Sequence, residues 1–291
     1  MTRTAGSSVV ADQTTFRPLE PVESTIEHDD YSTHYIKAGS GPAIVLLHGS
    51  GPGVSARANW VPTMKSELAQ HFTLIAPDIV GFGATEQHPE VDFTHDNRVE
   101  HIASFLTALD LAPARLVGNS MGGAISLGIA ARYPELVERM VLMGSAGVSF
   151  PVTPEVDQLY GYTPSEDNMR GIFELMAYDR SRVTPELVRA RYEASLAPDV
   201  ASRWEKLFPA PRQRHIDACS LPFSTLSTIS TPTLLIHGVF DRVVPVATSL
   251  RLVEVLPNAD LVVLGRCGHW AQVERGVAFR GEVARFFVQE G

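Results

Sequence analysis

The stretch "ARLVGNSMGGAISLGIAARYP" (Ala114–Pro134) contains the pattern that decides the fold. Its first part, Ala114–Ser120, is a short apolar run of the kind that forms a strand buried on both faces of a parallel sheet. A turn of small residues, Gly118–Gly122, comes next, and the apolar residues from Gly122 to Pro134 have helical spacing. A strand, a sharp turn and a helix in direct succession indicate one unit of an α/β sheet.

The same alternation of apolar runs and helical spacing continues on both sides of this stretch. It extends from about Ser32 to Gly147, resumes after residue 230, and ends in a helix over residues 277–290. Because strand–helix–strand units form right-handed crossovers, we expect a mostly parallel central sheet flanked by helices. The predicted strands are Ala43–Gly49, Phe72–Asp78, Ala114–Ser120, Arg139–Ser145, Thr231–Asp241 and Ala259–Trp270, and the clearest helices between them are His95–Leu111 and Gly122–Pro134.

The segment of residues 148–218 interrupts this alternation, because apolar strand runs vanish there. An all-helical segment between two halves of one sheet predicts a lid over residues 148–218, on a core made of residues 1–147 and 219–291. The helical stretches of this segment are Asn168–Asp179, Thr184–Ser195 and Asp199–Phe208.

Length and composition limit the class of protein. The 291 residues suffice for one large domain or two of ordinary size, and 44% hydrophobic and 20% charged residues are ordinary for a soluble globular protein. A formal net charge of −9 argues against a nucleic-acid partner, and no apolar run is long enough to span a membrane.

The N-terminal stretch is polar and lacks the apolar block of a signal peptide, so we expect a cytoplasmic protein. Cys219 and Cys267 are too few for a disulfide framework or a zinc site, so we expect no metal.

Three residues of types that form a nucleophilic site lie at the ends of separate predicted strands. Gly118–Gly122 has the pattern G-x-S-x-G, in which Ser120 occupies a strained turn between a strand and a helix. A serine hydroxyl needs a base to take its proton, and the base needs an acid to orient it. Asp241 and His269 each follow a later strand, and the order Ser, Asp, His is that of the α/β-hydrolase fold. The sequence therefore predicts a catalytic triad of Ser120, Asp241 and His269.

Asp78 also ends a predicted strand and is a competing candidate for the triad acid. It precedes Ser120 in the chain, so it fits the order of the triad residues poorly. We interpret Asp78 as a structural residue of a turn.

The loop after His48 has three glycines and a proline within "GSGPG" (Gly49–Gly53). Such backbone freedom suits either a tight surface turn or a loop whose N–H groups face a reacting atom. When Ser120 attacks a carbonyl, the oxygen becomes negative and needs preorganised donors. We expect the backbone N–H of Met121, directly after the nucleophile, and that of Ser50 to form this oxyanion hole.

With these residues in place, the chain from about Tyr31 onward resembles the carbon–carbon bond hydrolases that act on meta-ring-fission products of aromatic degradation. The resemblance rests on "LLHGSGPGVSARANW", "LVGNSMGGAISL", "LMGSAGVSFPVT", "FPAPRQRH" and "RCGHWAQVE". The segments "GSAGVSFPVT" and "FPAPRQR" look most like the 2-hydroxymuconic semialdehyde and alkylbenzene branch and less like the biphenyl or steroid branches.

This resemblance implies a cofactor-free hydrolase of class EC 3.7.1.9 and a substrate of the 2-hydroxy-6-oxohexa-2,4-dienoate type. Water cleaves the C5–C6 bond after ketonisation of the dienol, which gives 2-hydroxypenta-2,4-dienoate and a carboxylic acid. The C6 carbonyl is attacked in the oxyanion hole, either by Ser120 to form an acyl-enzyme or by a water that Ser120 assists. The resemblance further implies a homodimer or higher homo-oligomer.

Four more residues have roles that the resemblance implies. Arg191 matches a position whose guanidinium binds the substrate carboxylate, although arginines on lid helices usually face solvent. Asn59 and Asn119 match positions that hydrogen-bond the polar end of the substrate; alternatively, Asn59 caps the following helix and Asn119 braces the turn at Ser120. Trp270 matches a residue beside the site, and a core tryptophan would give the same pattern.

The chain departs from its relatives at Arg57, where tryptophan is frequent, and at Phe240, where an acidic residue often precedes the triad acid. The region His215–Ser230 also matches poorly. An ordinary carboxylesterase with the same triad is the alternative function, and a non-catalytic hydrolase-fold protein that binds a ligand is a remote one. Epoxide hydrolases and haloalkane dehalogenases use an aspartate nucleophile, so Ser120 excludes them.

Overall fold

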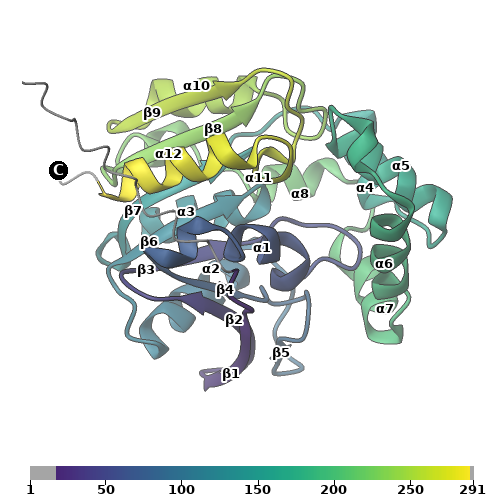
Figure 1. Cartoon of the computed structure of the whole chain (residues 1–291), viewed down its shortest axis with the longest axis horizontal. Helices are drawn as coiled ribbons and strands as arrows, with labels where there is room; N and C mark the ends of the chain where they lie inside the picture. The colour runs from purple at the N-terminus through teal and green to yellow at the C-terminus, as the bar shows by residue number, and fades with distance from the viewer. Residues whose placement is uncertain (1–17, 289–291) are drawn as a thin grey trace, which may run out of the picture.

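The protein contains an open sheet with helices on both faces, as the computed structural model shows (Figure 1). The structure describes residues 18–288. Residues 1–17, which belong to the predicted core and to the polar N-terminal stretch, and residues 289–291 lie outside the described part. No helix within the described part has both the length and the apolar character needed to cross a membrane.

Nine strands form one sheet within residues 18–288. They are β1 (Val22–His28), β2 (Tyr31–Gly39), β3 (Ala43–Leu47), β4 (Thr73–Pro77), β5 (Glu86–Gln87), β6 (Ala114–Asn119), β7 (Val137–Met143), β8 (Thr233–Gly238) and β9 (Ala259–Leu264). Their order is β1-β2-β4-β3-β6-β7-β8-β9, and β5 pairs with β2. In this order, each strand in the series β4-β3-β6-β7-β8-β9 is parallel to its neighbours in the series. β2 runs antiparallel to β1, β4 and β5. The sheet is therefore mostly parallel, with an antiparallel edge.

Two hydrophobic layers hold the helices against this sheet. On one face α1 (Ala56–Met64) and α12 (Gly276–Val288) pack together, and the rings of Trp60 and Phe279 stack with centroids 6.5 Å apart. The opposite face is covered by α2 (His95–Ala108), α3 (Met121–Arg132) and α10 (Ala247–Val255). The remaining short helices of the core are α9 (Phe223–Leu226) and α11 (Ala271–Glu274), and 3₁₀ turns lie at Glu67–Gln70, Pro134–Leu136 and Arg180–Arg182.

The chain between β7 and β8 is helical, and we call residues 148–218 the helical insertion. Its helices stand at one end of the sheet, beyond the carboxyl ends of the parallel strands (Figure 1). Thr153, Ser165 and Thr184 cap the first three of them, because each hydroxyl accepts a backbone N–H three residues later. The five helices are α4 (Pro154–Tyr160), α5 (Glu166–Met176), α6 (Pro185–Ser195), α7 (Pro198–Leu207) and α8 (Gln213–Ala218).

The observed elements differ from the predicted ones mainly at their ends and at the sheet edge. The predicted strands extend past the observed strands into the loops that follow, where some residues, such as Asp78 and Cys267, are also buried. The sequence prediction omits the antiparallel strands β1, β2 and β5, and most residues of β1 alternate between exposed and partly buried positions. It also omits α1, which contains Pro62 and follows the glycine-rich loop directly. The exact borders between core and lid remain a prediction.

Candidate active site

Ser120 lies in the sharp turn between β6 and α3. Its backbone dihedrals are φ 53° and ψ −111°, a region that non-glycine residues rarely adopt. Small residues make this turn possible: a Cβ at Gly118 would lie 2.5 Å from the Gly122 oxygen, and a Cβ at Gly122 would overlap the Leu47 oxygen. The Ser120 N–H donates to the Met143 oxygen at 2.9 Å, so the turn is anchored to the end of β7.

Asp241 and His269, the predicted acid and base, are hydrogen-bonded to each other. Asp241 follows β8, His269 follows β9, and His269 Nδ1 lies 2.7 Å from Asp241 Oδ2. The other carboxylate oxygen accepts the backbone N–H groups of Val243 and Val244, each at 2.9 Å. The His269 backbone N–H donates to the oxygen of Met176 in the helical insertion at 2.7 Å. Hydrogen bonds to the backbone thus fix both residues, and the carboxylate orients the imidazole.

A second histidine, His237, contacts the same acid. His237 is fully buried, its Nε2 lies 3.2 Å from Asp241 Oδ2, and its Nδ1 lies 2.7 Å from the Ser249 hydroxyl. Burial alone would raise the pKa of Asp241, but His269 and His237 outweigh burial and hold this pKa well below its usual value. Asp241 is therefore ionised at neutral pH. Sequence analysis does not find His237, and its position four residues before Asp241 is the only signal in the chain.

The end of β7 brings Ser120 close to the Asp241–His269 pair. Gly144 directly follows Met143, the residue that accepts the Ser120 N–H. A Cβ at Gly144 would lie 3.1 Å from His269 Nδ1 and 3.2 Å from Asp241 Oδ2. Among the hydrogen bonds of residues 18–288, none involves the Ser120 hydroxyl. The three predicted triad residues thus lie beyond the carboxyl ends of the parallel strands. A hydrogen bond between the catalytic serine and histidine often tightens only when substrate binds.

The glycine-rich loop Gly49–Gly53 lies against Ser120. A Cβ at Gly49 would come within 3.2 Å of the Ser120 Cβ, so only glycine allows this approach without a shift. Ser50 and Met121 line the same cavity as Ser120. This placement fits the predicted oxyanion hole, and the role of the two N–H groups stays a prediction.

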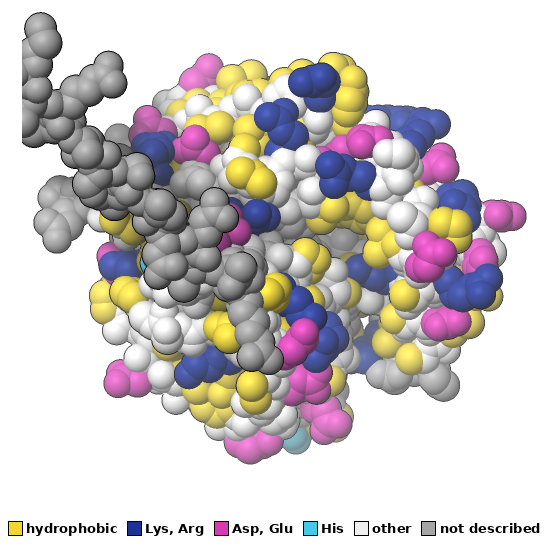
Figure 2. All heavy atoms as spheres, in the orientation of Figure 1, with side chains coloured by type: hydrophobic (Ala, Val, Ile, Leu, Met, Phe, Trp, Pro, Cys, Tyr) yellow, Lys and Arg dark blue, Asp and Glu magenta, His cyan; other side chains and the backbone are white. Residues whose placement is uncertain are grey.

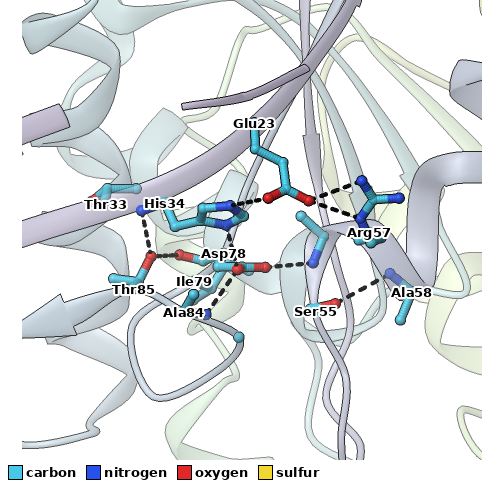
Figure 3. Close-up of polar contacts among 12 residues, drawn as sticks. Glu23, Thr33, His34, Ser55, Arg57, Ala58, Asp78, Ile79, Ala84 and Thr85 are labelled. Carbon is cyan, nitrogen blue, oxygen red and sulfur yellow. Dashed lines mark hydrogen bonds and ion pairs between the residues drawn. The ribbon is translucent and has the colours of Figure 1, made fainter. Parts of the chain in front are cut away.

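Asp78 organises the start of α1 and does not contact the predicted base. Figure 3 shows its carboxylate between His34 and two backbone N–H groups. Asp78 accepts the N–H of Ala56 at 2.6 Å and that of Ala84 at 2.9 Å, and it lies 2.8 Å from His34 Nδ1. Burial alone would raise the pKa of Asp78, but the hydrogen bond from His34 and the other contacts hold it below its usual value. Asp78 therefore fixes the point where the glycine-rich loop enters α1.

A cavity of about 160 Å³ borders His269 between the core and the helical insertion, and we call it the polar cavity. Figure 2 shows a hollow between these two parts of the molecule. Among the described residues that line the cavity, Arg191 of α6 is the only Lys, Arg, Asp or Glu. Burial lowers the pKa of Arg191 to about 10, so its guanidinium is still charged at neutral pH.

Arg191 has no acidic partner among residues 18–288. Its guanidinium carbon lies 5.7 Å from the centroid of the Phe173 ring, a cation–π distance. A buried charge normally needs a compensating partner. Arg191 lacks such a partner and lines a cavity, which fits the predicted role of binding an anion, and this role stays a prediction.

Asn59, Asn119 and Trp270 also line the polar cavity. Ser55, and not Asn59, caps α1, so the alternative role of Asn59 as a helix cap is wrong. The Asn59 Nδ2 is buried without a hydrogen-bond partner, and so is the Oε1 of Gln272 in the same cavity. Sequence analysis does not single out Gln272, although it lies within the family-like segment "GHWAQVE". Trp270 packs edge-on against an aromatic ring of α5, with centroids 4.9 Å apart.

A second, smaller cavity, of about 30 Å³, is lined by Ser120, and we call it the apolar cavity. Ser50 lines both cavities, so they adjoin at the glycine-rich loop. The apolar side chains of the second cavity come from α4, α8, the start of α3 and the loops after β7 and Asp241. They are Met121, Ala146, Phe150, Val156, Leu159, Ile216, Val243 and Val244.

The two departures from the family lie away from these cavities. Arg57 is exposed and pairs with Glu23 at 2.8 Å (Figure 3). Phe240 is also exposed, and its ring centroid lies 4.7 Å from that of Tyr178. In the part of the chain that the structure describes, no three His, Cys, Asp or Glu side chains are placed to hold a metal ion.

Comparison with known proteins agrees with this geometry. Residues 42–276 match the family described as alpha/beta hydrolase fold. The chain is 46% identical over 258 residues to the 2-hydroxy-6-oxo-2,4-heptadienoate hydrolase of Pseudomonas putida strain F1, covering 89% of this chain and 93% of that protein. It is 43% identical over 257 residues to the 2-hydroxymuconate semialdehyde hydrolase of Pseudomonas sp. strain CF600, covering 88% and 90%. The meta-cleavage product hydrolase CumD of Pseudomonas fluorescens IP01 superposes with a TM-score of 0.87 at 45% identity, covering 91% of this chain and 97% of that one.

Proposed function

Since this chain belongs to the α/β-hydrolase fold family and, within it, to the meta-cleavage product hydrolases, we propose that it hydrolyses 2-hydroxy-6-oxohexa-2,4-dienoate-type ring-fission products. Water cleaves the C5–C6 bond, and the products are 2-hydroxypenta-2,4-dienoate and a carboxylic acid. The enzyme thus acts on a carbon–carbon bond of a ketonic substance in aromatic degradation. The reaction requires no cofactor.

The observation that carries this proposal is the unpaired Arg191 in the polar cavity. The dienoate end of the substrate bears a carboxylate, which a planar guanidinium holds through two parallel hydrogen bonds. The buried Nδ2 of Asn59 and Oε1 of Gln272 offer a donor and an acceptor to the neighbouring oxygens of the substrate. An ordinary carboxylesterase needs no fixed charge at this place.

The geometry of the predicted triad supplies the chemistry at the other end of the substrate. Ketonisation first moves a proton from the dienol oxygen to C5. His269, oriented by Asp241, then takes a proton from the Ser120 hydroxyl or from a water beside it. Attack on the C6 carbonyl produces an oxyanion, which the N–H groups of Ser50 and Met121 stabilise. When the C5–C6 bond breaks, its electron pair is delocalised toward the C2 oxygen.

The apolar cavity supports a small C6 substituent. Its lining is mainly aliphatic and aromatic and, among the described residues, contains no Lys, Arg, Asp or Glu that could pair with a large charged group. The cavity is small, so we expect faster turnover of substrates with a 6-H, 6-methyl or 6-ethyl group than of one with a 6-phenyl group. The chain is similar to a 2-hydroxy-6-oxo-2,4-heptadienoate hydrolase, whose named substrate has a methyl group at C6, and this similarity supports the same order of turnover rates.

The lid, the cellular location and the assembly of the enzyme are part of the same proposal. We propose that the helical insertion is a lid over the two cavities, and that the enzyme works in the cytoplasm on a small dissolved anion. The predicted assembly is a homodimer or higher oligomer.

The test compares two arginines of the same helix. Arg191 faces the polar cavity, whereas Arg189 is exposed and lies 3.7 Å from Glu166. We expect Arg191→Met to lower kcat/KM for the 6-methyl dienoate about a hundredfold, because losing one partner of a buried charge pair costs about 2–5 kcal/mol. Arg189→Met should stay close to wild type. Cleavage is followed by the loss of the visible absorbance of the conjugated dienolate.

Hydrolysis of p-nitrophenyl acetate completes this test, because that ester has no carboxylate for Arg191 to bind. We expect Arg191→Met to keep whatever esterase activity the wild type has. Equal bleaching by Arg191→Met and wild type would favour the carboxylesterase alternative. Rapid ester hydrolysis without any dienolate bleaching would favour it as well.

A further inference from the structure

A third cavity lies between α2 and the helical insertion, and the proposed reaction does not use it. We call it the α2 groove. Its buried polar side chains are His95 and Arg98, both from α2. The more exposed charged residues that line it are Asp92, Arg203, Lys206 and Arg214. Basic side chains therefore outnumber acidic ones among the described lining residues, and the potential in the groove favours an anion.

Arg98 is a second buried cation without an acidic partner. It is 4% exposed, and its Nε and Nη2 atoms are buried without hydrogen bonds. Its guanidinium carbon lies 5.7 Å from the centroid of the Phe82 ring. Burial lowers the pKa of Arg98, and no carboxylate of residues 18–288 forms an ion pair with it. Unpaired donors of this kind are rare in a folded protein, because each one has lost its water without a replacement.

His95 lies one helical turn before Arg98, so the two side chains share one face of α2. It is 7% exposed, and neither of its ring nitrogens has a hydrogen-bond partner. Burial, followed by the nearby charge of Arg98, lowers the pKa of His95 to about 4, so the ring is neutral at pH 7. A neutral imidazole offers one N–H donor to a ligand. The two residues therefore hold several buried donors without partners, and no negative charge.

We propose that the α2 groove binds a small carboxylate with an apolar tail, which Arg98 and His95 hold by its oxygens. The groove walls beside these donors are apolar, which favours a ligand with an apolar tail. They are formed by the side chains of Val91, Phe93, Leu207, Phe208 and Ala218. A free phosphate would gain the charge of Arg98 but nothing from these walls, whereas a short-chain acid gains both.

The α2 groove and the apolar cavity share a wall. His215 and Cys219 line both of them. Tyr160 of the apolar cavity stacks on Phe208 of the groove, with ring centroids 4.0 Å apart and planes 7° from parallel. Resting on the proposed function, the carboxylic acid released at C6 forms just across this wall and has the chemistry that the groove selects. The acid product of the reaction is thus the natural occupant.

The test measures binding of 4,4,4-trifluorobutyrate by ¹⁹F NMR in the Arg191→Met background, so that the polar cavity does not compete. We expect this protein to bind the probe, and the added change Arg98→Met to weaken binding at least tenfold. Arg98→Lys should restore part of the affinity, because it keeps the charge. Arg189→Met in the same background is the matched control and should leave the affinity unchanged.

Three results would overturn the proposal: no binding in the Arg191→Met protein, the same affinity with and without Arg98, or displacement of the probe by inorganic phosphate as effectively as by butyrate. Near-UV circular dichroism checks the fold of the Arg98→Met protein. Should that protein not fold, His95→Leu replaces it, and an unchanged affinity in His95→Leu overturns the proposal instead. Dienolate bleaching by the wild type is measured separately, so failure of the proposed function is distinguishable from failure of the second site.

Discussion

Three charged side chains, two of them buried and Arg191 partly buried, differ in how their charge is compensated. Asp241 receives two backbone N–H groups and contacts from two histidines. Arg191 and Arg98 have no carboxylate partner among residues 18–288. A compensated charge holds a fixed geometry, whereas an uncompensated one costs stability and is retained where a ligand supplies the opposite charge. Whether a buried charge has partners within the protein thus helps to distinguish a residue that positions its neighbours from one expected to bind a ligand.

Replacing Ser120 by alanine removes the nucleophile, while the small side chain still suits the tight turn. We expect Ser120→Ala to lower kcat/KM for the 6-methyl dienoate by at least about a thousandfold, as in other enzymes that lose a triad member. The rate of bleaching measures this loss, and circular dichroism verifies the fold. Bleaching at the wild-type rate would remove Ser120 from the mechanism.

Ser50 allows a matched pair of changes, because its predicted role needs the backbone N–H and not the hydroxyl. We expect Ser50→Ala to bleach the dienolate at nearly the wild-type rate. Ser50→Pro lacks the N–H, and its kcat should fall about a hundred- to a thousandfold, the usual cost of one oxyanion-hole donor. An equal loss in both variants would contradict the assignment of this N–H.

At the scale of elements, one carboxylate ties the helical insertion to the loop that carries His269. Glu274 of α11 is 7% exposed. Its Oε1 accepts the N–H of Gly268 at 2.8 Å, and its Oε2 accepts those of Tyr178 and Asp179 at 2.8 and 2.9 Å. Three backbone donors from two distant segments therefore depend on a single side chain. The position of the base and the chain after α5 are coupled through it.

Glu274→Gln tests this coupling, because an amide nitrogen of the same size cannot accept a hydrogen bond. We expect the free energy of unfolding to fall by about 1–3 kcal/mol, the cost of leaving a buried donor unsatisfied. We also expect kcat to fall more than KM rises, because His269 loses its support. Urea unfolding and steady-state bleaching measure the two effects.

The control for this change is Glu282→Gln, which breaks the surface ion pair with Arg285 on α12. It should alter the free energy of unfolding by less than about 1 kcal/mol. Equal effects of the two variants on stability and kcat would show that the hydrogen bonds of Glu274 to the helical insertion do not support His269.

Some elements could be predicted from the sequence and others could not, for reasons of burial. The parallel strands are buried on both faces, so each leaves a continuous apolar run, as in β8, whose six residues are all buried. β1 lies at the sheet edge with only partly buried residues on one side, so its polar sequence resembles a loop. α1 begins beside a glycine-rich loop and contains Pro62, which hides its helical pattern.

At the scale of the whole molecule, the strand order explains why widely separated residues meet. β6, β7 and β8 are neighbours in the sheet, so Ser120, Gly144 and Asp241 follow adjacent carboxyl ends. Chain order and strand ends were therefore enough to predict which residues gather. His237 and Arg98 could not be found this way, because their burial and their partners depend on segments far apart in the chain.

The low pKa of Asp241 makes the stability of the folded protein depend on pH. In the unfolded chain this carboxyl binds a proton near pH 4, whereas in the folded protein it binds one only at lower pH. The unfolded state therefore holds more protons in this interval, and stability falls as pH falls. We expect the free energy of unfolding to drop less from about pH 5 to about pH 3 in Asp241→Asn than in wild type. Urea unfolding at both pH values checks this, and parallel curves would contradict it.

Resting on the two proposed ligand sites, we expect the enzyme with ligands at Arg191 and Arg98 to be more stable than the empty enzyme. A compound that binds the native chain alone adds about 2.7 kcal/mol of stability at a hundred times its dissociation constant. Proteases cut chains in proportion to how often they open. We therefore expect empty copies to be digested first and copies supplied with aromatic breakdown products to last longer. The supply of substrate would then prolong the lifetime of the enzyme that consumes it.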